Sequence, residues 1–140
     1  MDSPIDQYLQ RIHTEIADLK DGKPYSSIPA MANVDPDNFG IVLATADGYV
    51  YEIGATREEF SIQSISKPFT SGLALADRGM GDVDAKVDVE PSGDSFNEIS
   101  LAEGTGRPAN AMINAGALTA TSLVRGSGGN SRFKRILNTY

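Results

Sequence analysis

A serine and a lysine three residues apart, Ser64 and Lys67, form the one pair in this sequence whose types and spacing suit covalent chemistry. If a helix begins near Ser64, residues i and i+3 lie on one face and their side chains can meet. Ser64 would then lie at the positive end of the helix dipole, where backbone N–H groups stabilise a developing negative charge. The same positive end and partial burial would disfavour a charged Lys67, so that a neutral amine could accept the proton of the serine.

The residues after Lys67 support a helix that begins here. Pro68 is tolerated only in a first turn, and an apolar line at helical spacing follows before Gly79 ends the helix. The members of that line are Ile65, Phe69, Leu73 and Ala76. A Ser-x-x-Lys pattern is also frequent by chance, and Ser64 could be only an N-cap and Lys67 a solvated side chain.

The N-terminal segment has the pattern of a capped amphipathic helix. Ser3, Pro4 and Asp6 suit the N-cap, the first helical position and the acid of a capping box. The apolar residues after them recur at helical spacing and end at Gly22; they are Ile5, Leu9, Ile12, Ile16 and Leu19. We expect a surface helix that packs on another element, with His13 as a surface residue.

Two β-rich segments flank a turn further along the chain. Residues 40–45 are continuously apolar, residues 46–48 (Ala-Asp-Gly) suit a turn, and residues 49–53 return with β-rich side chains. This pattern predicts an antiparallel hairpin. Because the first strand is apolar throughout, we expect helices to cover both of its faces. A single helical turn is expected at residues 28–32.

The last third of the sequence is mainly helical. Asn114 is placed to be the N-cap of a helix that runs to about Arg125, and residues 126–130 (GSGGN) suggest a flexible loop. A further helical pattern starts at Phe133 and is cut by the end of the chain. Since two strands alone are marginally stable, we expect the chain to be the front part of a longer protein.

Composition excludes several classes of function. The 140 residues carry a net charge of −7, which argues against nucleic-acid or anionic-membrane partners. There is no cysteine and only one histidine, so disulfides, thiolate metal sites and histidine-rich metal sites are excluded. No apolar run reaches transmembrane length and no signal peptide is visible. We expect a cytoplasmic protein.

Several short motifs resemble those of the serine-dependent glutaminases, the bacterial and kidney-type L-glutamine amidohydrolases. They occur in the order and approximate spacing of that family, from about Gly22 to Val124. The motifs are Gly40-Ile41, Asp47-Gly48, residues 60–67 (FSIQSISK), residues 89–93 (VEPSG), Phe96-Asn97 and residues 112–117 (MINAGA).

The resemblance implies an α/β protein with a β-lactamase/transpeptidase-like fold, an antiparallel sheet flanked by helices and the start of a helical lobe, incomplete in this chain. Residues 1–140 would be the N-terminal portion of a glutaminase domain. Residues 1–78 would supply the helix, the hairpin and the nucleophile helix of the α/β lobe, and residues 79–140 the start of the helical lobe.

The resemblance also implies roles for four residues. Ser64 resembles the nucleophile that attacks the side-chain amide of L-glutamine, and Lys67 the base that activates it. Gln63 and Asn114 resemble residues that hydrogen-bond the substrate. The reaction would release ammonia and form an acyl-enzyme on Ser64, which water hydrolyses to L-glutamate. No metal or organic cofactor is required, and we expect a homo-oligomer.

The sequence departs from the family in two ways. A tyrosine that normally precedes the Ile-Pro of the first loop is replaced by Ser27, which puts the mode of substrate binding in doubt. Family members are also much longer, and their later part supplies a glutamate, an asparagine, several tyrosines and an oxyanion donor. If 140 residues are the whole protein, we expect no appreciable glutaminase activity.

Two other functions remain open on the residues alone. Penicillin-recognising serine acyltransferases share Ser-x-x-Lys, although their Ser-Asp-Asn and Lys-Thr-Gly motifs do not occur in this sequence. The chain could also be a non-catalytic truncated lobe that associates with another chain through an unpaired hairpin edge and exposed apolar helix faces.

Overall fold

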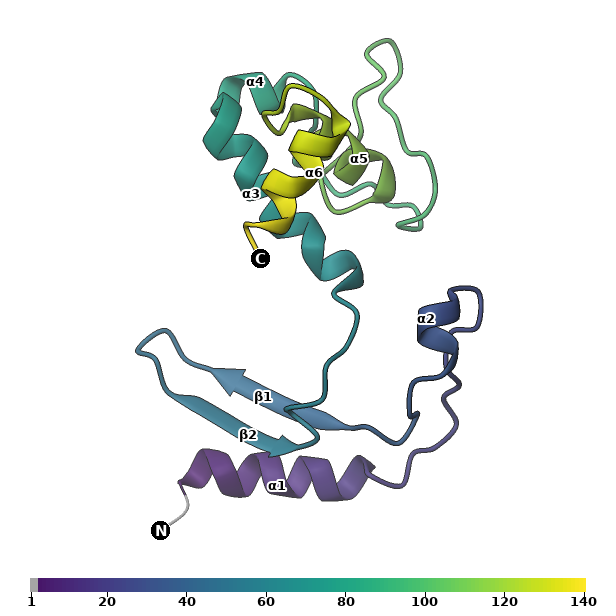
Figure 1. The fold of residues 1–140 in the computed structure, drawn as a ribbon, viewed down its shortest axis with the longest axis vertical. Helices are drawn as coiled ribbons and strands as arrows, with labels where there is room; N and C mark the ends of the chain where they lie inside the picture. The colour runs from purple at the N-terminus through teal and green to yellow at the C-terminus, as the bar shows by residue number, and fades with distance from the viewer. Residues whose placement is uncertain (1–2) are drawn as a thin grey trace. The chain divides into compact units, whose positions relative to one another are not determined.

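The structure is a computed structural model that describes residues 3–140 (Figure 1). The chain divides between Ser61 and Ile62 into two compact units. In chain order, the elements of the first unit are α1 (Pro4–Ile16), α2 (Pro29–Ala32), β1 (Gly40–Ala44) and β2 (Val50–Gly54). Those of the second are a 3-10 turn (Gln63–Ile65), α3 (Ser66–Arg78), α4 (Met80–Asp84), α5 (Asn114–Leu123) and α6 (Gly129–Leu137).

Helix α1 begins with the predicted capping box. Ser3 Oγ accepts a hydrogen bond from Asp6 N at 3.1 Å, and Ser3 N donates to Asp6 Oδ2 at 3.0 Å. Leu9 is the buried residue of the helix. The helix ends at Ile16 rather than near Gly22, and Leu19 is 72% exposed, so the apolar spacing continues past the packed part of the helix.

Strands β1 and β2 form the predicted antiparallel hairpin, in a register that pairs Ile41 with Ile53. Side chains that are paired across the strands share a face, and Ile41, Tyr51 and Ile53 are half-buried on one of them. Val42 and Val50, on the other face, are 54% and 57% exposed. The prediction that β1 is covered on both faces is therefore wrong for this structure, in which α1 packs on the hairpin.

His13 is not the simple surface residue expected from the sequence. Its ring stacks on Phe39 with 4.7 Å between centroids, and its Nε2 lies 3.4 Å from the Phe39 carbonyl oxygen. Gly54 lies against the same pair with φ +78°, and a Cβ at this position would overlap both His13 and the Phe39 carbonyl. Only glycine therefore fits this end of the hairpin.

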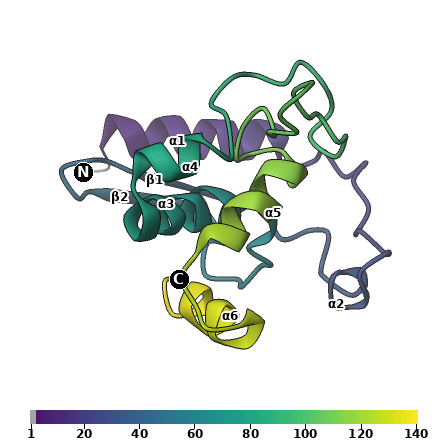
Figure 2. The same cartoon turned by 90° about the horizontal axis from the view of Figure 1, so that it is seen from above.

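The second unit is built on the packing of α3 against α5 and α4 (Figures 1 and 2). Its core contains Ala74, Val83 and Val124. The buried face of α3 carries Thr70, Ala74 and Asp77 rather than the predicted apolar line, in which Leu73 is half-buried and the other members are exposed. The difference arises because the buried residues of α5 are the small Gly116 and Ala120, which let the two helices pack closely through small side chains.

Helix α6 starts earlier than predicted, because Gly129 and Asn130 belong to its first turn and not to a flexible loop. It ends at Leu137. Its Arg135 donates two hydrogen bonds to the buried carboxylate of Asp77 in α3, which also accepts one from the backbone N–H of Arg125 at 2.8 Å. One acidic side chain thereby connects α3, α6 and the segment that follows α5.

Candidate active site

Ser64 and Lys67 lie where two kinds of helix join. Gln63–Ile65 form a 3-10 turn, and α3 continues from Ser66. The prediction of a helical start near Ser64 is confirmed, with Pro68 in the first turn of α3. Ser64 is not the N-cap of α3, because that position is held by Ile65 and no side chain caps the helix. The serine is exposed and the lysine is half-buried.

Gln63, the residue before Ser64, has an unusual backbone. Its φ is +43°, and no other residue except glycine has a positive φ in the described part of the chain. Such conformations cost free energy and are concentrated at functional sites. Its carbonyl oxygen accepts a 2.7 Å hydrogen bond from Ser66 Oγ, which helps to hold the turn. Gln63 therefore begins the 3-10 turn that leads into α3.

The amine of Lys67 contacts residues far along the chain. Its Nζ donates to the Met112 carbonyl oxygen at 2.8 Å and to Asn114 Oδ1 at 2.7 Å. The same nitrogen lies 5.7 Å from the centroid of the Phe96 ring, within the range of a cation–π contact. Within residues 3–140, the hydrogen bonds of this amine go to these two oxygens and not to Ser64.

The sequence predicts Asn114 as the N-cap of α5, but in the structure it is the first residue of this helix. The N-cap is Ile113, which provides no side-chain hydrogen bond. Asn114 N donates to the Phe96 carbonyl oxygen at 2.9 Å. Because the amide side chain does not cap its own helix, its oxygen is available to Lys67. Of the predicted site residues, Lys67 and Asn114 are thus in direct contact, and Gln63 and Ser64 lie in the preceding turn.

Sequence reasoning missed the roles of Met112 and Phe96. Both belong to motifs that carry the family resemblance, which was the available signal. However, a backbone carbonyl acts without any particular side chain, so the residue type at Met112 could not reveal its contact. Phe96 has no polar atom in its side chain and gives no chemical signal by itself.

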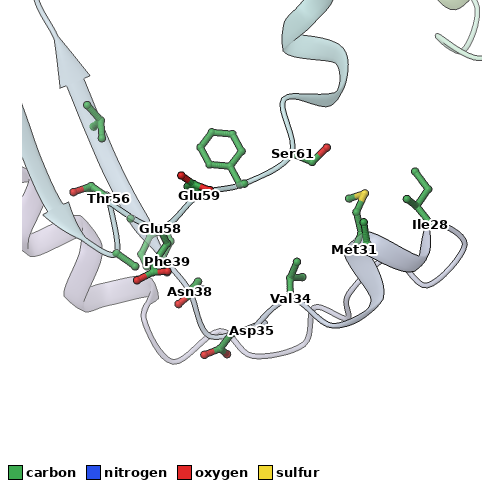
Figure 3. A pocket seen from close by; sticks show the side chains of 15 residues that line it. Ile28, Met31, Val34, Asp35, Asn38, Phe39, Thr56, Glu58, Glu59 and Ser61 are labelled. Carbon is green, nitrogen blue, oxygen red and sulfur yellow. The ribbon is translucent and has the colours of Figure 1, made fainter.

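A cavity of about 740 Å³ lies in the first unit, and none of the residues in these contacts lines it (Figure 3). Ile28 lies just before α2, Met31 on α2 and Val34 after it, while Glu58 and Glu59 lie on the segment after β2. Its lining includes three carboxylates and no lysine, arginine or histidine. The carboxylate of an amino acid would therefore meet only like charge, and we do not assign the active site to this cavity.

Ser27, which replaces the tyrosine expected in the family, lies in the turn just before α2.

No group of three or more His, Cys, Asp or Glu side chains that could hold a metal ion occurs in residues 3–140. In the same residues, no helix is both long and apolar enough to cross a bilayer.

Comparison with known proteins decides the family. The sequence profile of the family described as Glutaminase matches residues 22–140. The chain belongs to the glutaminase family. Among curated relatives of this glutaminase chain, the glutaminase of Microcystis aeruginosa is 45% identical over 137 residues, which are 98% of this chain and 40% of the relative.

Solved structures agree with the assignment. Mglu, solved in a tris and glutamate form, is 45% identical and superposes with a TM-score of 0.87 over 99% of this chain and 31% of its own length. The probable glutaminase ybaS is 34% identical, with a TM-score of 0.88 over 99% of this chain and 46% of its own. The predicted α/β, β-lactamase-like fold is confirmed. The chain spans between 31% and 46% of the length of these relatives.

Proposed function

We propose that this chain is the N-terminal portion of an enzyme that hydrolyses L-glutamine to L-glutamate and ammonia, with Ser64 as nucleophile and Lys67 as base. The observation that carries the proposal is the position of the Lys67 amine. It is held by two acceptors, Met112 O and Asn114 Oδ1, one helical turn after an exposed serine.

The two acceptors suit a lysine that serves as a base. A neutral primary amine has two hydrogens and one lone pair. Hydrogen bonds to the Met112 and Asn114 oxygens use both hydrogens and leave the lone pair to receive a proton. The same contacts limit the freedom of a long side chain, which favours a defined position for the nitrogen.

In the reaction, Ser64 Oγ would form a bond to the carbonyl carbon of the substrate's side-chain amide while Lys67 takes the hydroxyl proton. Collapse of the tetrahedral intermediate would break the C–N bond, and the proton on Lys67 would leave with the nitrogen as ammonia. Water would then attack the γ-glutamyl ester, giving up a proton to Lys67, and L-glutamate would leave as the ester bond breaks and Ser64 regains its proton.

The substrate assignment is supported by the relatives. Curated relatives that cover nearly all of this chain are named glutaminase, and Mglu was solved in a form with glutamate. We propose that Gln63 and Asn114 hydrogen-bond the substrate. Asn114 Nδ2 could do so while Oδ1 remains on Lys67, because an amide side chain offers a donor and an acceptor on separate atoms.

A chimera tests this function. Residues 1–140 replace the matching part of the Microcystis aeruginosa glutaminase, and ammonia release from L-glutamine is measured. We expect activity that Ser64→Ala lowers by roughly 10⁴-fold or more and Lys67→Met by a comparable factor. Ser122→Ala is the control, because this exposed serine lies in α5 and its hydroxyl donates to the Thr119 carbonyl oxygen of the same helix. A folded chimera that is inactive, or that stays active without the Ser64 hydroxyl, refutes the proposal.

For the 140-residue chain by itself we propose no appreciable turnover, because the later part of the family supplies a substrate clamp and an oxyanion donor. The same ammonia assay on the isolated chain tests this. Turnover that disappears in Ser64→Ala would contradict it.

We also propose that the chain self-associates. In the first unit the hairpin leaves Val42 and Val50 exposed, and the two strands form the whole of their sheet within the described residues. Sedimentation velocity should show a concentration-dependent mass that Val42→Thr combined with Val50→Thr reduces. A monomer at all concentrations would exclude it.

A further inference from the structure

The contacts of Lys67 depend on a loop whose shape is set by another asparagine. We propose that Asn110 is a positioning residue that places the Met112 carbonyl and the start of α5 against the Lys67 amine. The inference rests on the proposed role of Lys67 as the base. It adds a residue that acts through Lys67 and is not itself in contact with the amine.

Asn110 organises its loop through both ends of its side chain. Its Oδ1 accepts hydrogen bonds from Met112 N at 2.9 Å and from Ile113 N at 3.2 Å. These N–H groups precede a helix whose N-cap, Ile113, has no side-chain hydrogen bond of its own. The amide oxygen of Asn110 therefore accepts hydrogen bonds as a capping side chain would, and it fixes the direction of the peptide groups around Met112.

The other end of the side chain anchors the loop to a distant segment. Asn110 Nδ2 donates to the Glu90 carbonyl oxygen at 2.9 Å. Two backbone hydrogen bonds join the same segments, from Glu90 N to Ala109 O at 3.0 Å and from Asp88 N to Pro108 O at 2.9 Å. The side chain thus extends a short backbone pairing up to the residues that contact Lys67.

The space around Gly116 is independent evidence that the backbone of Asn110 lies directly against the start of α5. A Cβ on this residue would overlap the Asn110 carbonyl oxygen and carbon. The first turn of α5 therefore packs directly on the backbone of Asn110, and Gly116 is buried. Because the loop and the helix start are in close contact, loss of the Asn110 side chain should displace both acceptors of Lys67 together.

The test measures the amine directly in the 140-residue chain. All lysines are acetylated under limiting N-hydroxysuccinimide acetate, and mass spectrometry gives the relative rate at each site. In Asn110→Ala we expect Lys67 to react about tenfold faster, which corresponds to the loss of roughly one hydrogen bond's protection. The rates at the exposed Lys20, Lys23, Lys86 and Lys134 should not change. The far-UV circular dichroism spectrum should match that of the parent, which excludes general unfolding as the cause of a faster reaction at Lys67.

Three variants calibrate the result. Asn114→Ala removes a direct acceptor and should also raise the rate at Lys67. Asn110→Asp keeps the oxygen that accepts from Met112 and Ile113 and should restore most of the protection. Asn130→Ala changes an exposed asparagine in α6 and should have no effect.

An unchanged Lys67 rate in Asn110→Ala, with a raised rate in Asn114→Ala, would overturn the inference. So would a loss of helical circular dichroism in Asn110→Ala that accompanies the rise at Lys67. In the active chimera, Asn110→Ala should lower kcat about tenfold with little change in KM, as expected for a displaced base. If the chimera is inactive the proposed function fails, but the acetylation rates still report whether Asn110 positions Lys67.

Discussion

At the scale of single residues, the candidate site depends on the side chain of Asn114, which does not cap its own helix. An asparagine before a helical segment suggests an N-cap, yet in the structure its helix starts one residue earlier than that role requires. Its amide is therefore directed to Lys67 rather than to its own backbone. The contact connects residues 47 positions apart in the chain, and no local pattern could have predicted it.

The left-handed backbone of Gln63 leads to a prediction about stability. Gln63→Gly should be more stable than Gln63→Ala by about 1 kcal/mol, because only glycine adopts positive φ without a steric cost. Urea unfolding followed by circular dichroism measures the difference. The same pair of substitutions at Gln10, in the middle of α1, should give the opposite order by about 1 kcal/mol. An alanine variant at Gln63 as stable as the glycine variant would show that the turn is not strained.

At the scale of elements, small residues decide how α3 and α5 approach. Ala74 is fully buried in α3, and Gly116 and Ala120 are buried in α5. Close packing of this kind tolerates no added atoms. It also brings the first turns of both helices together, which is what carries Asn114 to Lys67.

Gly116→Ala should therefore destabilise the second unit by about 3 kcal/mol, because its Cβ would overlap the Asn110 carbonyl. It should also raise the acetylation rate at Lys67. Gly72→Ala is the matched control. Gly72 is exposed in α3 with nothing within 4 Å of an added Cβ, so alanine should stabilise by up to about 1 kcal/mol. Urea unfolding of the two variants measures both effects, and equal stability of the two would contradict this account of the packing.

At the scale of the whole molecule, each of the two units is stabilised by a different set of internal contacts. The first relies on α1 and its hairpin, with Leu9 as its buried apolar side chain. The second has a larger core and an ion pair between the buried carboxylate of Asp77 and the exposed Arg135. Hydrogen bonds from Arg135 and from the Arg125 backbone lower the pKa of Asp77 below its ordinary value of 3.8. The Asp77 carboxylate raises the pKa of Arg135.

This pair predicts how stability depends on pH. A carboxyl group whose pKa is lower in the folded state stabilises the fold above its ordinary pKa, and the effect is lost as pH falls through the folded value. The thermal midpoint of the chain should therefore decrease below pH 3.8. Asp77→Asn should have a lower midpoint than the parent at pH 7, and the difference should shrink in acid.

Thermal melts between pH 7 and pH 2 provide the measurement. Glu103→Gln, which changes an exposed carboxylate in the same unit, should follow the parent at every pH. If the difference between Asp77→Asn and the parent is the same at all pH values, the pair of Asp77 and Arg135 is not the source of the acid sensitivity.

The sequence by itself determined the local elements. The capping box of α1, the hairpin, the helical start near Ser64 and the end of α3 at Gly79 follow from short-range signals, since caps, turns and periodicity act within a few residues. The family motifs likewise predicted the glutaminase family and the β-lactamase-like fold.

Only the tertiary structure decided which faces are buried and which side chains meet. Val42 is exposed although its strand is apolar, and α3 buries Asp77 in place of Ala76, because burial depends on what packs against an element and not on its own pattern. The contacts of Lys67 with Met112 and Asn114, and the loop that Asn110 shapes around them, likewise arise from segments far apart in the chain. A local sequence pattern cannot predict these contacts, because they form only when α3 and α5 pack together.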